Sequence, residues 1–325
     1  MKNCIIIAIL AFALDCFAQA PLQSSPEPAK NVETLNQEQE VEGSGQLMNY
    51  AWPPLLSFFL PGFDQWYEGR NIEAMSFTGI FIASNLWAFS ESMKIQKELE
   101  DGFELDFQSS FDDRFRSFTY ASSLSLATAF VSGYDSFRHT VQNNKKYGQF
   151  EFIDYQESVP ELLLSAFDFR YLARPTTYIP LLIGLGLHLA IPTNLYQESF
   201  SGSLFPKDIV FATGISLNAG VGEEAFFRGY LMPALTQWWS SPLWANIAQT
   251  AVFGALHISN GGGAGPFQAV GGFYWGWLTQ RNGWSIGEAA FGHFWWDVLV
   301  LSAGLYRANI NSNEIVWLPK ISLVF

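Results

Sequence analysis

Apolar stretches that approach the length needed to cross a bilayer alternate with polar stretches from Leu47 onward. A membrane-spanning helix needs about 20 mostly apolar residues. The pattern therefore predicts an all-α fold, a polytopic membrane helical bundle with about seven or eight membrane segments. The predicted segments are residues 47–63, 72–89, 117–134, 177–195, 209–238, 243–258, 267–279 and 286–306.

The first of these segments has two interpretations. Pro53, Pro54 and Pro61 interrupt residues 47–63, so the segment is either a kinked span or a re-entrant hairpin. We favour the span, because it places the polar loop at residues 135–174, which is rich in Lys and Arg, on the cytoplasmic side.

Breaks between the segments follow from charge and from turn residues. The charged stretch at 91–116 is expected to separate two helices. Asp208 is expected to cap the N-terminus of the helix that follows it. The dipeptide Asn282-Gly283 and the glycines at 261–263 are turn signals.

Composition supports a membrane protein. Hydrophobic residues make up 49% of the 325-residue chain, aromatic residues 17% and charged residues 14%, whereas soluble domains carry about 25% charged residues. The formal net charge of -13 argues against nucleic acid as a partner, because phosphate binding needs a basic surface.

The N-terminus has the pattern of a secretory signal. Lys2 precedes a short apolar run, and small residues suitable for cleavage follow, which predicts a signal peptide over residues 1–18. The alternative is a short uncleaved anchor. Cleavage would remove both cysteines, Cys4 and Cys16, and with them any disulfide or thiolate chemistry. Residues 19–46 are polar and predict a disordered tail, followed by a helical accessory module at 47–150 and a second module at 175–308.

The second half of the chain concentrates charged residues within apolar segments. Such residues are costly inside a membrane and are functional candidates. In the sequence GVGEEAFFRGY, Glu223 and Glu224 are adjacent, and Arg228 lies one helical turn after Glu224, where it can pair with a carboxylate. Adjacent carboxylates repel each other, so an arginine beside one of them would give the two groups different roles.

Two of the four histidines lie in neighbouring segments. His257 faces the protein interior if the side of its helix that carries Phe253 is packed. His293 and Asp297 are four residues apart and share one helix face. A glutamate with two histidines can act on water: the carboxylate takes a proton, while the imidazoles orient the water, bind a metal or stabilise an oxyanion.

These three segments resemble the motif set of the CAAX-processing and bacteriocin-processing (CPBP, or ABI) family of intramembrane proteases. That set is EExxxR, FxxxH, and HxxxN or HxxxD on successive helices. This chain has EEAFFR at 223–228, FGALH at 253–257 and HFWWD at 293–297. The resemblance covers residues 177–306 and implies an endopeptidase that cleaves a membrane-associated protein or peptide.

The resemblance also implies residue roles. Glu223 would be the general base, assisted by His257, and His293 with Asp297 would form the oxyanion or metal side of the site. Glu224 belongs to the same catalytic group, and Arg228 and Phe253 would support it. Members are commonly called metalloproteases, so a divalent metal such as zinc on Glu223, His257 and His293 is one expectation. The family and this chain both lack HExxH, so metal-free chemistry is the other.

Further expectations concern substrate and location. Prenyl-protein proteases end the third motif in Asn, whereas this chain has Asp297, which weakens an assignment to prenyl-protein processing. A secretory signal does not fit that role either. The lipid bilayer is the expected surroundings, and the bacterial inner membrane is the expected location.

The N-terminal module resembles something else. Residues 57–69, SFFLPGFDQWYEG, are similar to the PGxGQxYxG hairpin of small bacterial membrane domains of unknown function, and VSGYDSFRH at 131–139 fits their second half.

Other interpretations remain open at this point. Glu223, Glu224 and Arg228 could form a structural ion cluster, and His257 could be a hydrogen-bonded core residue. The whole chain could be a non-catalytic membrane scaffold or an immunity or regulatory protein that keeps the protease fold. It could also be a transporter that uses the carboxylates for protons, although no inverted repeat is visible.

Overall fold

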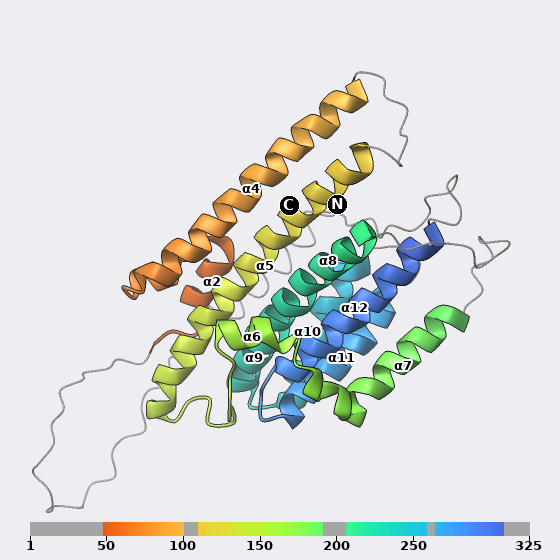
Figure 1. Ribbon diagram of the computed structural model, residues 1–325. Coiled ribbons are helices and arrows are strands. Elements are labelled where there is room, and N and C mark those ends of the chain that lie inside the picture. Colours follow the sequence, from red (N-terminus) through yellow and green to blue (C-terminus); the bar gives the residue numbers. More distant parts are fainter. Residues whose placement is uncertain (1–47, 101–109, 191–205, 259–263, 309–325) are drawn as a thin grey trace, which may run out of the picture.

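The computed structural model describes residues 48–100, 110–190, 206–258 and 264–308. Within these ranges every regular element is a helix, which confirms the all-α prediction for this part of the chain. The predicted signal peptide, the polar tail and the glycines at 261–263 lie outside the described residues. Figure 1 shows the long helices lying side by side, with α5 between α4 and α8, and with α7 at the opposite edge.

The N-terminal module begins with a short helical hairpin. Helix α2 is Trp52–Phe59 and helix α3 is Phe63–Tyr67. Gly62 between them has φ of 92°, and a side chain there would meet the Ala74 carbonyl oxygen at 2.5 Å, so only glycine fits this turn. Eight residues of helix cover about 12 Å. Residues 47–63 therefore do not form one helical span, as the favoured interpretation expected, but two short helices joined by a turn.

Two long helices follow, and both extend beyond the predicted segments. Helix α4 is Asn71–Glu100 and helix α5 is Ser110–Asn144. The charged stretch at 91–116 was expected to separate two helices, but its first ten residues continue α4 to Glu100 and its last seven begin α5. Lys94 pairs with Glu91 at 2.6 Å within α4, and Arg114 of α5 pairs with Glu98 at 3.1 Å.

A connecting region and a bundle of helices complete the described chain. Short elements follow α5: η1 at Lys145–Tyr147, α6 at Val159–Ser165 and η2 at Phe169–Ala173. The bundle then contains α7 (Pro175–Ala190), α8 (Pro206–Glu224), the π-helix η3 (Ala225–Leu231), α9 (Met232–Trp239), α10 (Pro242–His257), α11 (Ala264–Arg281) and α12 (Gly287–Ala308).

The start of α8 differs from the prediction. The helix begins at Pro206, so Asp208 lies inside its first turn and does not cap it. Its carboxylate instead pairs with Arg116 of α5 at 2.7 Å, with only 1% of the Asp208 side chain exposed. Proline suits the first turn of a helix because its missing N–H has no partner there, and a tertiary ion pair takes the carboxylate.

Membrane-spanning character is supported for one helix. Among the described residues, α4 is the one whose length and hydropathy suit a bilayer crossing. Helix α10 has only 16 residues, and α8 carries charged residues at both ends. Seven or eight membrane segments were predicted, but only one helix of the described residues has the length and hydropathy of a membrane span.

Aromatic rings join the hairpin to the middle of the bundle. The ring of Phe58 in α2 lies 4.8 Å from that of Phe226 and 4.9 Å from that of Tyr230, both in η3. Phe130 of α5 stacks on Phe226 at 4.9 Å. The N-terminal helices therefore pack directly on the π-helix that follows the paired glutamates.

The turn before α12 fixes the start of that helix. Gly283 has φ of 65°, as expected of the turn predicted at Asn282-Gly283. The Glu157 carboxylate then accepts hydrogen bonds from the backbone N–H groups of Ile286 at 3.0 Å and Gly287 at 2.8 Å. A carboxylate bonded to the first amides of a helix stabilises that end and sets the position of the residues two turns later.

Candidate active site

The paired glutamates lie at the end of α8 in two different environments. Successive residues on a helix point about 100° apart. Glu224 points into the bundle with its side chain fully buried, whereas 21% of the Glu223 side chain is exposed. The two carboxylates are chemically identical, and the helix alone gives them different surroundings.

Glu224 lies between a cation and an imidazole. Its Oε1 accepts a hydrogen bond from Arg228 at 2.8 Å, and neither side chain of this pair is exposed. The same oxygen lies 2.8 Å from Nδ1 of His293 on α12. The expected pairing of Arg228 with a carboxylate is present. A buried pair of this kind needs good geometry and further hydrogen bonds to offset desolvation. Oε1 of Glu224 has two partners, whereas Oε2 of Glu224 and Nε of Arg228 are buried without one among the described residues.

The arginine sits in the π-helix η3. π-Helical turns are rare and appear mostly as local bulges, frequently at functional sites. The Arg228 side chain also donates to the Gly272 carbonyl oxygen of α11 at 2.9 Å, and its guanidinium carbon lies 4.6 Å from the centre of the Phe253 ring. Arg228 therefore connects η3 to both α10 and α11.

His257 extends from the last turn of α10 toward Glu223. Its Nδ1 lies 2.7 Å from the Phe253 carbonyl oxygen. A carbonyl only accepts, so this nitrogen carries the proton. The other nitrogen, Nε2, lies 3.9 Å from Oε1 of Glu223. Phe253 itself is 1% exposed, which confirms that this side of α10 is packed.

His293 approaches the same carboxylate from α12. Because Nδ1 faces the Glu224 carboxylate, which only accepts when ionised, this nitrogen also carries a proton. Its Nε2 lies 3.8 Å from Oε2 of Glu223 and 3.5 Å from Oδ2 of Asp297. His293 and Asp297 thus share one helix face, as their spacing predicts.

The structure brings all five predicted residues together. We refer to them as the carboxylate–imidazole centre: Glu223, Glu224, His257, His293 and Asp297. Both Nε2 atoms face Glu223 at separations too long for a direct hydrogen bond. The three helices therefore converge on a place where a carboxylate and two imidazoles can act on one water molecule.

The fit of these side chains to a metal is poor. Within the described residues, no group of three or more His, Cys, Asp or Glu side chains is arranged to hold a metal ion. Donors on one zinc ion at 2.0–2.1 Å would lie about 3.3 Å apart in a tetrahedron, closer than the imidazoles lie to Glu223. The expected metal set of Glu223, His257 and His293 does not fit as placed.

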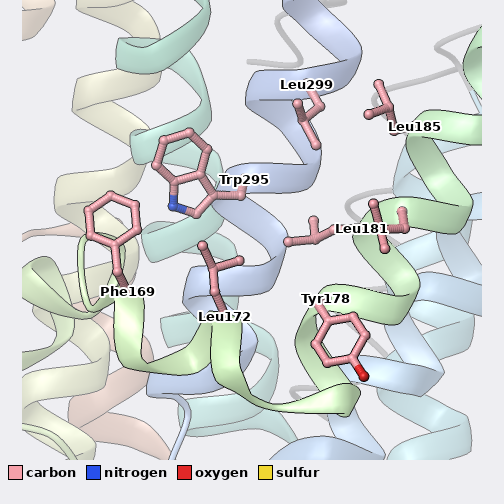
Figure 2. Close-up of a pocket in the computed structure, with 8 residues that line it drawn as sticks. Phe169, Leu172, Tyr178, Leu181, Leu185, Trp295 and Leu299 are labelled. Atoms are coloured by element: carbon pink, nitrogen blue, oxygen red, sulfur yellow. The ribbon is translucent and has the colours of Figure 1, made fainter.

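The opposite face of α12 is apolar. Figure 2 shows Trp295 and Leu299 facing residues of α7 and η2 across a hollow of about 220 Å³. It is lined by Phe169, Leu172, Tyr178, Leu181, Leu182, Leu185, Trp295 and Leu299. Its described lining contains no carboxylate or imidazole, so the carboxylate–imidazole centre and this hollow lie on different faces of α12.

Sequence reasoning missed two contributors to the centre. Gly272 supplies a carbonyl to Arg228, and Gln249 donates to that same carbonyl at 3.1 Å. Gln249 lies four residues before Phe253 and eight before His257, so its spacing placed it on the same face of α10. That spacing is the signal that could have found it.

The described residues form an all-α bundle in which successive helices bring carboxylates, imidazoles and an arginine together. A comparison with protein-family models identifies the family of this region: residues 205–299 match the family described as type II CAAX prenyl endopeptidase Rce1-like. This part of the chain is a domain of that family, as the motifs indicated, and membership suggests an intramembrane protease. No curated protein and no solved structure matches the chain.

Proposed function

We propose that this protein is an intramembrane endopeptidase that hydrolyses a peptide bond of a membrane-associated protein or peptide. The observation that carries the proposal is the position of the Glu223 carboxylate, with Nε2 of His257 at 3.9 Å and Nε2 of His293 at 3.8 Å. The family match over residues 205–299 supports the same reaction class.

Glu223 is the general base in this proposal. It is the more exposed of the two adjacent glutamates, so water and a substrate carbonyl can reach it. Its carboxylate takes a proton from water as the water oxygen attacks the carbonyl carbon. His257, whose Nε2 is free to accept because Nδ1 is bonded to the Phe253 carbonyl oxygen, orients the water from the other side.

His293 and Asp297 act on the developing oxyanion. The Glu224 carboxylate at Nδ1 stabilises a protonated His293 ring, which then donates from Nε2 to the oxyanion. Ionised Asp297, at 3.5 Å from Nε2, further stabilises that cation. When the C–N bond breaks, the proton held by Glu223 passes to the leaving amine, and the base is restored.

Glu224 and Arg228 hold this geometry without touching the reacting atoms. Arg228 neutralises the buried Glu224 carboxylate and fixes it beside Nδ1 of His293. The substrate, we infer, enters between helices from the bilayer. Because Asp297 stands where prenyl-protein proteases have Asn, an unprenylated membrane peptide is the preferred substrate class over a prenylated one.

The test uses the full chain reconstituted in liposomes. The probes are two internally quenched peptides with the same cleavage region, one farnesylated at a C-terminal CAAX sequence and one anchored by an unmodified apolar helix. Glu223→Gln keeps the size of the side chain but removes the base, and we expect kcat to fall by about a thousandfold or more. Glu73→Gln, at an exposed carboxylate in α4, is the matched control and should retain full activity.

The outcomes separate the alternatives. Equal cleavage by wild type and Glu223→Gln would contradict the proposal, and an unchanged cellular phenotype in that variant would point to a scaffold. Activity that disappears with a chelator and returns with zinc would contradict metal-free water activation. Preference for the farnesylated probe would contradict the substrate class.

A further inference from the structure

A second buried polar group lies behind the centre, between α10 and α11. Gln249 is fully buried. Its Nε2 donates to Oδ1 of Asn246 at 2.7 Å and to the Gly272 carbonyl oxygen of α11 at 3.1 Å. Asn246 in turn donates from Nδ2 to the Phe273 carbonyl oxygen at 3.0 Å. Two amide side chains of α10 thus hold two consecutive carbonyl groups of α11.

This amide pair meets the arginine of the centre at one atom. The Gly272 carbonyl oxygen accepts both from Gln249 and from Arg228, the latter at 2.9 Å. Arg228 then bonds to Glu224 and Glu224 to His293, each at 2.8 Å. Four successive hydrogen bonds therefore connect the Gln249 amide to the imidazole of His293.

Close helix packing makes the connection possible. A methyl group on Gly272 would lie 3.1 Å from the Arg228 side chain, and one on Gly276 would lie 2.9 Å from Nε2 of Gln249. Two glycines four residues apart let neighbouring helices approach closely. The amide of α10 and the guanidinium of η3 can therefore reach the same backbone carbonyl.

Arg228 depends on that carbonyl for its orientation. Its guanidinium has two hydrogen-bond acceptors, the Glu224 carboxylate and the Gly272 carbonyl oxygen, while its Nε has none among the described residues. If the Gly272 carbonyl oxygen moved, the planar Arg228 guanidinium would turn, because only the Glu224 carboxylate would then hold it. Gln249 holds Gly272, and thereby the second acceptor, in place.

We infer that Gln249 is a positioning residue for the proposed hydrolysis, acting through Gly272, Arg228 and Glu224 on the orientation and protonation of His293. The inference rests on the proposed function and extends it to a residue outside the three motifs. Gln249 touches neither substrate nor the reacting atoms, so its removal changes turnover and leaves substrate binding unaltered.

The test replaces Gln249 by Met, which is similar in shape but cannot donate a hydrogen bond. Using the two quenched peptides and the full chain in liposomes, we expect kcat to fall about tenfold with KM unchanged, as expected when a supporting shell is lost. Gln65→Met is the matched control. Gln65 is also fully buried, and its Nε2 donates to a backbone carbonyl of α5 at 2.8 Å, but among the described residues its hydrogen bonds go to Ser57, Ser132 and Asp135 and not to Arg228.

A second measurement does not depend on any substrate. The chain has only four histidines, so ¹⁵N-histidine labelling in detergent micelles gives a simple spectrum, and His293→Gln identifies the His293 signals. We expect the Nδ1 signal of His293 to shift in Gln249→Met and to stay unchanged in Gln65→Met. If Gln249→Met does not fold, Gly276→Ala disturbs the same amide pair from α11.

The outcomes distinguish this inference from the proposed function. A tenfold loss of kcat and a shifted His293 signal in Gln249→Met, both absent in Gln65→Met, support the inference. Wild-type kcat in Gln249→Met, or equal losses in both variants, would overturn it. If the wild type cleaves neither probe, the proposed function fails, and an unchanged His293 signal in Gln249→Met would then overturn the positioning role separately.

Discussion

Two regions of the molecule place an arginine beside carboxylates, and they use it differently. In the carboxylate–imidazole centre, Arg228 and Glu224 are fully buried and bonded at 2.8 Å. In the N-terminal hairpin, Arg70 bonds to Glu68 at 2.8 Å and to Asp135 at 2.6 Å, with 21% of the arginine side chain exposed. The chemical groups are the same, so the difference lies in how deeply the arginine is buried and in whether a neighbouring carboxylate is left without an arginine partner.

The hairpin uses its polar groups to hold helices together. Gln65 donates to the Ser132 carbonyl oxygen at 2.8 Å and to Asp135 at 3.0 Å, and Arg70 bonds to both neighbouring carboxylates. The centre instead pairs Arg228 with Glu224 alone and leaves Glu223 facing two imidazoles. A buried arginine that engages one carboxylate of an adjacent pair therefore leaves the other available for chemistry.

The largest effect expected from this comparison concerns Arg228. Its replacement by Met leaves the Glu224 carboxylate buried without a full counter-charge, which costs about 3 to 5 kcal/mol. Arg70→Met removes a partly exposed cation and should cost less, on the order of 1 to 2 kcal/mol. Denaturant unfolding in detergent micelles, followed by tryptophan fluorescence, measures both.

A double variant sharpens that prediction. Replacing Arg228 by Met and Glu224 by Leu together removes the unpaired charge, so unfolding free energy should recover relative to Arg228→Met alone, while peptide cleavage stays lost. Equal costs for Arg70→Met and Arg228→Met would contradict the role assigned to burial.

Relations within one helix could be predicted from the sequence, whereas relations between helices that depend on tertiary packing could not. Motif spacing on helices was enough to predict the pairing of Glu224 with Arg228 and the shared face of His293 and Asp297, whereas the convergence of both histidines with the glutamates was expected only from the family resemblance. Helical geometry fixes such relations over three or four residues, so they do not depend on the rest of the fold.

Relations set by tertiary packing were missed. The charged stretch at 91–116 was expected to separate two helices, but residues 91–100 continue α4, and Glu98 there pairs with Arg114 of α5. The π-helix at Ala225–Leu231 has no local sequence signal, and the role of Gln249 depends on the approach of α11. Asp208 suited a helix cap locally, yet Arg116 of a distant helix pairs with it.

A smaller effect is expected from pH at the hairpin. Burial, with a contribution from the Asp64 carboxylate, raises the pKa of Glu68 to about 7 from its ordinary value of 4.5. The folded protein therefore holds the Glu68 proton more tightly than the unfolded chain does. This contribution to stability is complete below pH 4.5 and is lost as pH rises to about 7.

The measurement compares wild type with Glu68→Gln over that pH range. Burial lowers the pKa of His139, which acts in the opposite direction, but both proteins retain His139. We expect the melting temperature of wild type, relative to Glu68→Gln, to fall between pH 4.5 and pH 7. A difference that stays constant, or that rises with pH, would show that Glu68 keeps an ordinary pKa in the folded protein.

The smallest effect is expected at the surface, where Arg170 pairs with Asp168 of the same segment. The pair has good geometry, with separations of 2.8 Å from Nε and 2.7 Å from the terminal nitrogen, but 89% of the Arg170 side chain is exposed. Water screens such a pair, and holding two mobile side chains in one arrangement costs entropy. Arg170→Met should therefore leave the melting temperature of the reconstituted protein unchanged, although its hydrogen bonds are as short as those of Arg228. A loss as large as that of Arg228→Met would mean that hydrogen-bond geometry, rather than burial, decides what an arginine contributes in this fold.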